Sequence, residues 1–195
     1  RWSDLDFEAN AKEGIGVDWP IRYRDIEKWY DYVETYVGIS GRKEGLSQLP
    51  DGKFLPPFEL NCVEKDFRKN LKNKFNNRIL TSGTFAHITG NEKNFNGRGK
   101  CQSRNLCIRG CPFGAYYSSN SGTLPDANKT GNMTLRPYSI VHSIIYDEVK
   151  GKAIGVRVRD TETLEEIEFY SKIIFLNAST VNSTSIMSVS YTHLR

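Results

Sequence analysis

The sequence predicts a mixed α/β protein, and it predicts that the chain is an internal piece of a larger domain. Residues 20–38 and 61–75 carry apolar side chains at helical spacing, whereas residues 139–171 contain short segments rich in β-branched residues. Residues 172–176, KIIFL, are continuously apolar, as in a strand that is covered on both faces of a parallel sheet. Such a strand needs βαβ partners, and too few of them are found in the rest of the sequence.

The composition argues against two classes of partner. The 195 residues include 27 basic and 23 acidic side chains, for a net charge of only +4, and the basic residues are scattered. This balance gives little reason to expect a nucleic acid partner. No apolar run approaches the ~20 residues that a membrane helix needs, and the opening RWSDLDFEAN is unlike a signal peptide, so we expect a soluble chain.

The first predicted elements are two amphipathic helices. Residues 20–38 place six apolar side chains along one face, with Pro20 ahead of them and Gly38 where a C-cap glycine belongs. The second helix is expected to begin after Asn61, which can cap it, and Glu64 three residues later completes a capping box.

Strands follow in the last third of the chain. Three segments read SIVHSIIY, AIGVRVRD and EEIEFYS, at 139–146, 153–160 and 165–171. Polar turns, DEVKGK and DTETLE, join them, so we expect antiparallel hairpins. After the predicted parallel strand at 172–176, residues 180–187 are expected to open a helix.

Three of the four cysteines lie together in CQSRNLCIRGCPFGA, residues 101–115, in the order Cys-x5-Cys-x3-Cys-Pro. A short loop of this kind can turn three sulfur atoms toward one metal centre, and a proline after the last cysteine recurs in iron–sulfur ligand runs. Glycines at 99, 110 and 114 supply backbone freedom. Four nearby basic side chains would favour thiolate over thiol: Arg98, Lys100, Arg104 and Arg109. The pattern therefore favours an iron–sulfur site on Cys101, Cys107 and Cys111.

Other uses of these thiols stay open at the level of spacing. Zinc prefers four ligands in closely paired units, which the step from Cys101 to Cys107 does not match. A disulfide plus a free thiol, or three unligated cysteines, also fits the count. A catalytic thiol needs a base, and none of the three histidines, His87, His142 and His193, is close in sequence. We expect His87 and His142 to be packed or surface residues.

Several stretches of the chain resemble the glucose–methanol–choline (GMC) flavin oxidoreductases. GVDWPIRYRDIEKWYDYVETYVGISG, at 16–41, is similar to the family's segment of DWP, helix and GxSG. TLPDANKTGNMTLRPYSIVHSIIYDEVKGKAIGVRVRD, at 123–160, resembles its passage through the adenine-contacting strand, and KIIFLNASTVNSTSIMSVS, at 172–190, resembles a later strand and helix. Among the family, bacterial FAD-dependent sugar and gluconate-type dehydrogenase large subunits are the most similar branch.

The resemblance implies a fold and two cofactors. Residues 1–187 would be an internal fragment of an FAD/NAD(P)-binding Rossmann-like domain with part of the substrate domain, while 188–195 resemble a non-native tail. The family's adenine strand places the backbone of Val141 against FAD, and Ala178 falls near the dinucleotide. The three-cysteine loop of the branch implies a [3Fe-4S] cluster on Cys101, Cys107 and Cys111.

The implied activity is oxidation of a CH–OH group of a sugar, sugar acid, polyol or alcohol, with hydride passing to the flavin and electrons leaving through the cluster. A haem c electron-acceptor subunit and a small chaperone-like subunit are the implied partners, and the bacterial periplasm or membrane surface is the implied location, otherwise the cytoplasm. The GxGxxG phosphate loop is missing from the sequence, and the catalytic histidine of the family lies outside this chain, so residues 1–195 alone are expected to be inactive. The alternative is a small iron–sulfur or disulfide-stabilised binding module without catalysis.

Overall fold

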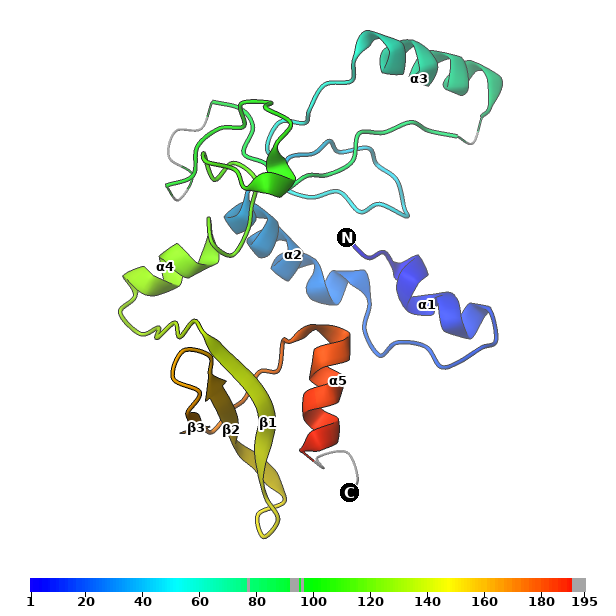
Figure 1. The fold of residues 1–195 in the computed structure, drawn as a ribbon. Coiled ribbons are helices and arrows are strands. Elements are labelled where there is room, and N and C mark those ends of the chain that lie inside the picture. The colour runs from blue at the N-terminus through cyan, green and yellow to red at the C-terminus, as the bar shows by residue number, and fades with distance from the viewer. Residues whose placement is uncertain (77, 92–94, 96, 191–195) are drawn as a thin grey trace. The chain divides into compact units, whose positions relative to one another are not determined.

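The computed structural model describes residues 1–76, 78–91, 95 and 97–190. They form two compact units, which divide between Met133 and Thr134. The first unit is built from helices and long loops, and the second from a small antiparallel sheet and one helix (Figure 1). The predicted mixture of helix and strand is therefore confirmed.

The described residues of the first unit form four α-helices and one short 3-10 helix. They are α1 (Asp4–Lys12), α2 (Tyr23–Val37), α3 (Cys62–Lys74), η1 (Cys107–Arg109) and α4 (Thr123–Lys129). Gly38 ends α2 in the left-handed conformation, with φ of 77°. The capping box of α3 also forms, because the Asn61 side chain accepts from the Glu64 amide at 2.9 Å and Glu64 accepts from the Asn61 amide at 2.8 Å. Both predicted helices are confirmed.

Main-chain pairing of Ile88 with Ala115 and the side chain of Arg98 hold the loops of this unit together. Ile88 is fully buried, and its amide donates to the Ala115 carbonyl at 3.0 Å. Arg98 is only 3% exposed, and its guanidinium donates to the carbonyls of Val37, Gly114 and Ala115. The arginine thus joins the end of α2 to the segment that follows the last clustered cysteine.

The second unit is a three-stranded antiparallel sheet. Its strands are β1 (Ser139–Asp147), β2 (Lys152–Asp160) and β3 (Glu166–Tyr170), in that spatial order. Helix α5 (Ser179–Val189) packs against β1 (Figure 1). The core of the unit lies where Ile144, Val158 and Ile186 are buried. The Ser190 hydroxyl accepts from the Ile144 amide at 2.6 Å and fixes the end of α5 to the strand.

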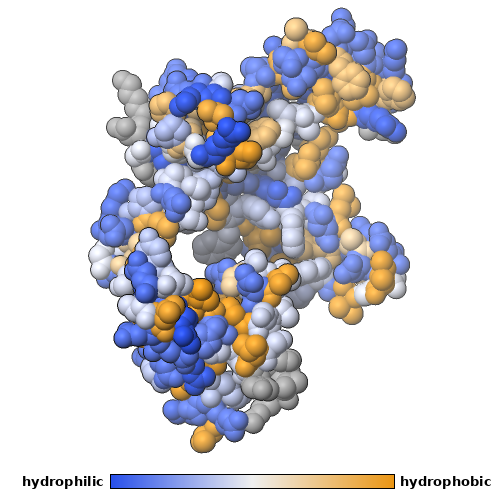
Figure 2. Space-filling model, in the orientation of Figure 1, coloured by the Kyte–Doolittle hydropathy of each residue, from blue (hydrophilic) through white to orange (hydrophobic). Residues whose placement is uncertain are grey.

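The strand predicted at residues 172–176 is not confirmed. The segment forms neither a helix nor a strand among the described residues, and Ile173 and Phe175 are 70% and 83% exposed. A parallel strand requires neighbours on the same sheet, and the sheet described here is antiparallel throughout. Figure 2 shows apolar side chains on the visible surface of this unit.

Residues 188–195 resemble a non-native tail. Residues 188–190 complete the end of α5. Residues 191–195, which include His193, lie outside the described part of the chain.

Across the described residues, no helix combines the length and the apolar character needed to span a bilayer.

Candidate functional site

The cysteine loop is held against the segment around Ile88 by main-chain hydrogen bonds. The Cys101 amide donates to the Ile88 carbonyl at 2.9 Å, and the Gly99 amide donates to the Phe113 carbonyl at 2.7 Å. Between these anchors the chain forms η1, and Gly110 and Gly114 adopt φ values of 92° and 61° that favour glycine. The predicted role of these two glycines is confirmed.

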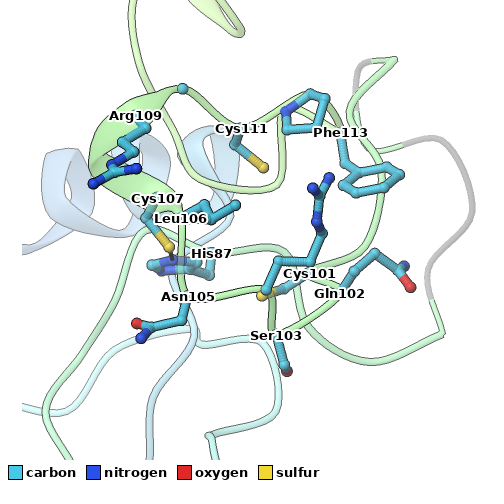
Figure 3. Close-up of a pocket in the computed structure, with 13 residues that line it drawn as sticks. His87, Cys101, Gln102, Ser103, Asn105, Leu106, Cys107, Arg109, Cys111 and Phe113 are labelled. Carbon is cyan, nitrogen blue, oxygen red and sulfur yellow. Dashed lines mark hydrogen bonds between the residues drawn. The ribbon is translucent and has the colours of Figure 1, made fainter.

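The three clustered cysteines line one cavity of about 150 Å³, which we call the cysteine pocket (Figure 3). Their side chains come from different parts of the loop, Cys101 from its start, Cys107 from η1 and Cys111 from the turn after it. All four cysteines of the chain are free thiols, and Cys62 is exposed on α3. Arg104 and Arg109 also line the cavity, whereas Arg98 is turned into the protein interior.

The Cys111 sulfur is surrounded by main-chain donors. Burial opposes ionisation of the thiol, but backbone amides outweigh it and lower the pKa of Cys111 below its usual value. These amides belong to Tyr116, Phe113, Ala115 and Gly114. Successive amides around one anion form a nest of the kind found at phosphate and iron–sulfur sites. The loop therefore stabilises negative charge on sulfur without relying on the nearby arginines.

One histidine reaches the cysteine pocket from outside the loop. His87 Nε2 lies 3.4 Å from Cys107 Sγ, and the ring packs between Phe58 and Tyr116, with ring centroids 5.7 and 5.1 Å away (Figure 3). Burial, and then the charge of Arg98, lower the pKa of His87 below its usual value. The sequence distance of twenty residues concealed this contact.

The thiols of the cysteine pocket do not converge on a single point. No group of three or more His, Cys, Asp or Glu side chains in the described ranges converges closely enough to hold one metal ion. A three-iron cluster needs less convergence, because each thiolate binds a different iron atom. Three thiols that line one cavity, with main-chain donors around Cys111, are the type of donor set that iron–sulfur clusters use.

A second cavity lies within the sheet unit. This cleft, of about 870 Å³, is lined by β1, β2, residues 174–178 and α5, and we call it the sheet cleft. The structure brings Val141 and Ala178, which lie far apart in sequence, to its walls, with Asn182 from the first turns of α5. The register of β1 and β2 shifts between Val141 and Ser143, so His142 has no partner across the ladder there.

The walls of the sheet cleft are of a type that planar cofactors use. They are mainly apolar, as at Ile140, Val156 and Phe175, with a few polar side chains, as in cavities that bind planar cofactors. Adenine needs such walls and a few polar partners. None of the described residues that line the cleft is a lysine or arginine, so the diphosphate of FAD needs groups that these residues do not provide there.

A family profile described as GMC oxidoreductase matches residues 15–192, which is most of the chain. The chain belongs to the GMC oxidoreductase family. Membership implies FAD as the cofactor and oxidation–reduction as the class of chemistry, and it agrees with the resemblance of the three segments described above.

Two curated relatives of this GMC chain are dehydrogenases by name. The fructose dehydrogenase large subunit of Gluconobacter japonicus is 23% identical over 147 residues, which cover 75% of this chain and 26% of the relative. The 2-methyl-1,2-propanediol dehydrogenase of Mycolicibacterium austroafricanum is 26% identical over 205 residues, covering 97% of this chain and 34% of the relative. The chain thus spans only about a quarter to a third of the length of these relatives.

Sequence reasoning identified five of the residues that line the two cavities but missed His87. Cys101, Cys107, Cys111, Val141 and Ala178 all line the cavities described here, although their roles toward a cofactor stay predictions. His87 was missed as a pocket residue. Its surroundings in sequence, TFAHITG, are those of a packed histidine, and only the pairing of His87 with Tyr116 carries it to the cysteines.

Proposed function

We propose that this chain is part of an FAD-dependent dehydrogenase that oxidises a CH–OH group of a sugar, sugar acid, polyol or simple alcohol. The observation that carries the proposal is the GMC profile match over residues 15–192, supported by two relatives whose names specify dehydrogenases of a sugar and of a diol. The residues that select among these substrates are expected in the part of the protein outside this chain.

The sheet cleft is the proposed adenine end of the FAD site. When bound, FAD supplies the acceptor for the hydride that leaves the substrate carbon. Val141 would present main-chain groups to the adenine edge, while Ala178, at the start of α5, keeps that wall of the cleft small. In the longer protein, residues 172–176 would join a Rossmann-like parallel sheet, which would cover Ile173 and Phe175.

The cysteine pocket is the proposed site of a [3Fe-4S] cluster. Such a cluster supplies one-electron transfer when it is bound. Two features of the chain support the assignment: three free thiols around one cavity, and main-chain donors directed at the Cys111 sulfur. An electron relay is useful to a dehydrogenase with a separate acceptor, and it is unnecessary in an oxidase that reduces oxygen directly.

The proposal extends to partners. The relative from Gluconobacter japonicus is named as a large subunit, which implies an assembly of several chains for that protein. By analogy, we propose a haem c subunit as electron acceptor and a small chaperone-like subunit, at the bacterial periplasmic or membrane surface.

Anaerobic reconstitution tests the cluster. We expect the full-length protein that carries this chain to take up about three irons and to give the EPR signal of an oxidised [3Fe-4S] centre. Cys107→Ser should abolish the signal and Cys62→Ser should retain it, because Cys62 is exposed on α3 and does not line the cysteine pocket. A folded, flavin-loaded protein without iron would leave a dehydrogenase that passes electrons by another route.

A further inference from the structure

His87 is the only histidine among the side chains that line the cysteine pocket in the described part of the chain. Its position is fixed from two directions. The main chain of His87 pairs with Tyr116 in an isolated bridge, and the ring is held against the rings of Phe58 and Tyr116. Consequently its Nε2 atom stays directed at Cys107 Sγ, 3.4 Å away, rather than at solvent (Figure 3).

The surroundings of the other ring nitrogen, His87 Nδ1, indicate which nitrogen carries the proton. His87 Nδ1 is buried and has no hydrogen-bond partner among the described residues. A neutral imidazole has one N–H, and a buried N–H without an acceptor is a rarer and costlier arrangement than a buried lone pair. The proton is therefore placed on Nε2, where the Cys107 sulfur can accept it.

The absence of an acceptor for Nδ1 among the described residues also argues against His87 as a metal ligand. A histidine that binds a metal through Nε2 has its proton on Nδ1, and that N–H almost always donates to a carboxylate, a carbonyl or water. The described residues place no such acceptor at His87 Nδ1. The arrangement suits a donor to a ligand sulfur rather than a fourth ligand.

We propose that His87 is a positioning residue of the cysteine pocket, whose Nε2–H donates a hydrogen bond to the Cys107 thiolate and raises the reduction potential of a cluster bound there. An N–H dipole directed at sulfur stabilises the additional negative charge of the reduced cluster more than the smaller charge of the oxidised one. The effect on potential rests on the proposed function, because it requires the cluster, whereas the hydrogen bond itself does not require a metal.

Three substitutions at His87 separate this role from simple packing. In His87→Gln the amide nitrogen can approach the position of Nε2, in His87→Asn it approaches the position of Nδ1, and His87→Leu has no donor. The full-length protein with each substitution is reconstituted anaerobically, analysed for iron, and titrated with dithionite, which supplies the single electron, while the EPR signal is followed.

We expect all three variants to bind as much iron as the wild-type protein. His87→Leu and His87→Asn should show a lower midpoint potential, and His87→Gln should lie close to the wild-type value. An unchanged potential in His87→Leu with a full cluster would overturn the proposal. Loss of iron or of the three-iron signal in all three variants would also overturn it, because His87 would then act as a ligand.

A second measurement examines the hydrogen bond without a metal. Two-bond 1H–15N correlation spectra of the metal-free protein, labelled with [15N]histidine, report which nitrogen of each ring carries the proton. We expect the Nε2–H tautomer for His87 at neutral pH, with the signal assigned by its absence in His87→Gln. A dominant Nδ1–H tautomer would overturn the proposal. If the wild-type protein binds no iron but shows the Nε2–H tautomer, the electron relay fails and the hydrogen bond stands.

Discussion

At the scale of single residues, Arg98 makes the most consequential contacts of the first unit. Its guanidinium is buried and donates to the carbonyls of Val37, Gly114 and Ala115, which belong to segments far apart in sequence. The Ala115 carbonyl keeps the Ile88 amide as a donor, so loss of the guanidinium removes the Arg98 donor of the Val37 and Gly114 carbonyls, at about 1–3 kcal/mol each. We expect Arg98→Met to destabilise the full-length protein by about 2–3 kcal/mol or more, measured by urea unfolding.

The control for this prediction is Arg24→Met. The Arg24 side chain on α2 is 86% exposed and makes only a long ion pair with Asp25, so its loss should change stability by less than about 0.5 kcal/mol. Equal stability of the Arg98 and Arg24 variants would show that the Val37 and Gly114 carbonyls find other partners, and the role assigned to Arg98 would be wrong.

The residues of the cysteine pocket show what sequence can and cannot reveal at this scale. The spacing of Cys101, Cys107 and Cys111 is local, so it identified three thiols that do line one cavity. The contact between His87 and Cys107 depends on how two loops pair, and no local pattern encodes it. The main-chain donors to Cys111 follow from backbone geometry that only the folded loop displays.

At the scale of elements, a single side-chain hydrogen bond joins α2 to α4. The Tyr36 hydroxyl donates to Asp126 Oδ2 at 2.7 Å, and this bond, followed by burial, raises the pKa of Tyr36 to about 12. Because the folded pKa lies above the ordinary value of 10.0, the bond stabilises the fold below about pH 10. That contribution is lost as the pH rises from about 10 to about 12.

We therefore expect Tyr36→Phe to be less stable than the wild-type protein at neutral pH, and the difference to shrink near pH 11. Urea midpoints at the two pH values measure it. Tyr32→Phe is the matched control on the same helix, since Tyr32 is 68% exposed. A difference that stays constant with pH would mean that the hydroxyl contributes through packing and not through its bond to Asp126.

Helices and strands were predictable where the residues that define them lie close together in the sequence. Helices α2 and α3 carry their own caps, Gly38 and the pair Asn61 and Glu64, so their positions followed from the sequence to within a few residues. The hairpins of β1, β2 and β3 likewise depend on short turns. Residues 172–176 have the composition of a buried parallel strand, but a strand forms only against hydrogen-bonded neighbours, and the described residues supply none for it.

At the scale of the whole molecule, we propose one explanation for the exposed apolar side chains and for the shortage of basic residues among the described lining of the sheet cleft. This chain covers 26% and 34% of the length of its two relatives, so further parts of a longer protein would cover these surfaces and complete the proposed FAD site. Ile173, Phe175 and Val181 are 70%, 83% and 77% exposed, as expected for surfaces that further parts of the protein cover.

Binding of FAD tests this explanation directly. The 195 residues contain no GxGxxG phosphate loop, and none of the described residues that line the sheet cleft is a lysine or arginine, so the cleft alone should hold FAD weakly. We expect residues 1–195 to bind FAD at least a hundredfold more weakly than the full-length protein, about 2.7 kcal/mol, by fluorescence titration. The isolated chain should also bind the apolar dye ANS strongly, and the full-length protein should not. Substitution of Val141 by Pro, which distorts the strand, serves as the control for binding in the cleft. Tight binding of FAD by residues 1–195 would show that the described residues already form a complete flavin site, and the apolar surfaces would then need another explanation.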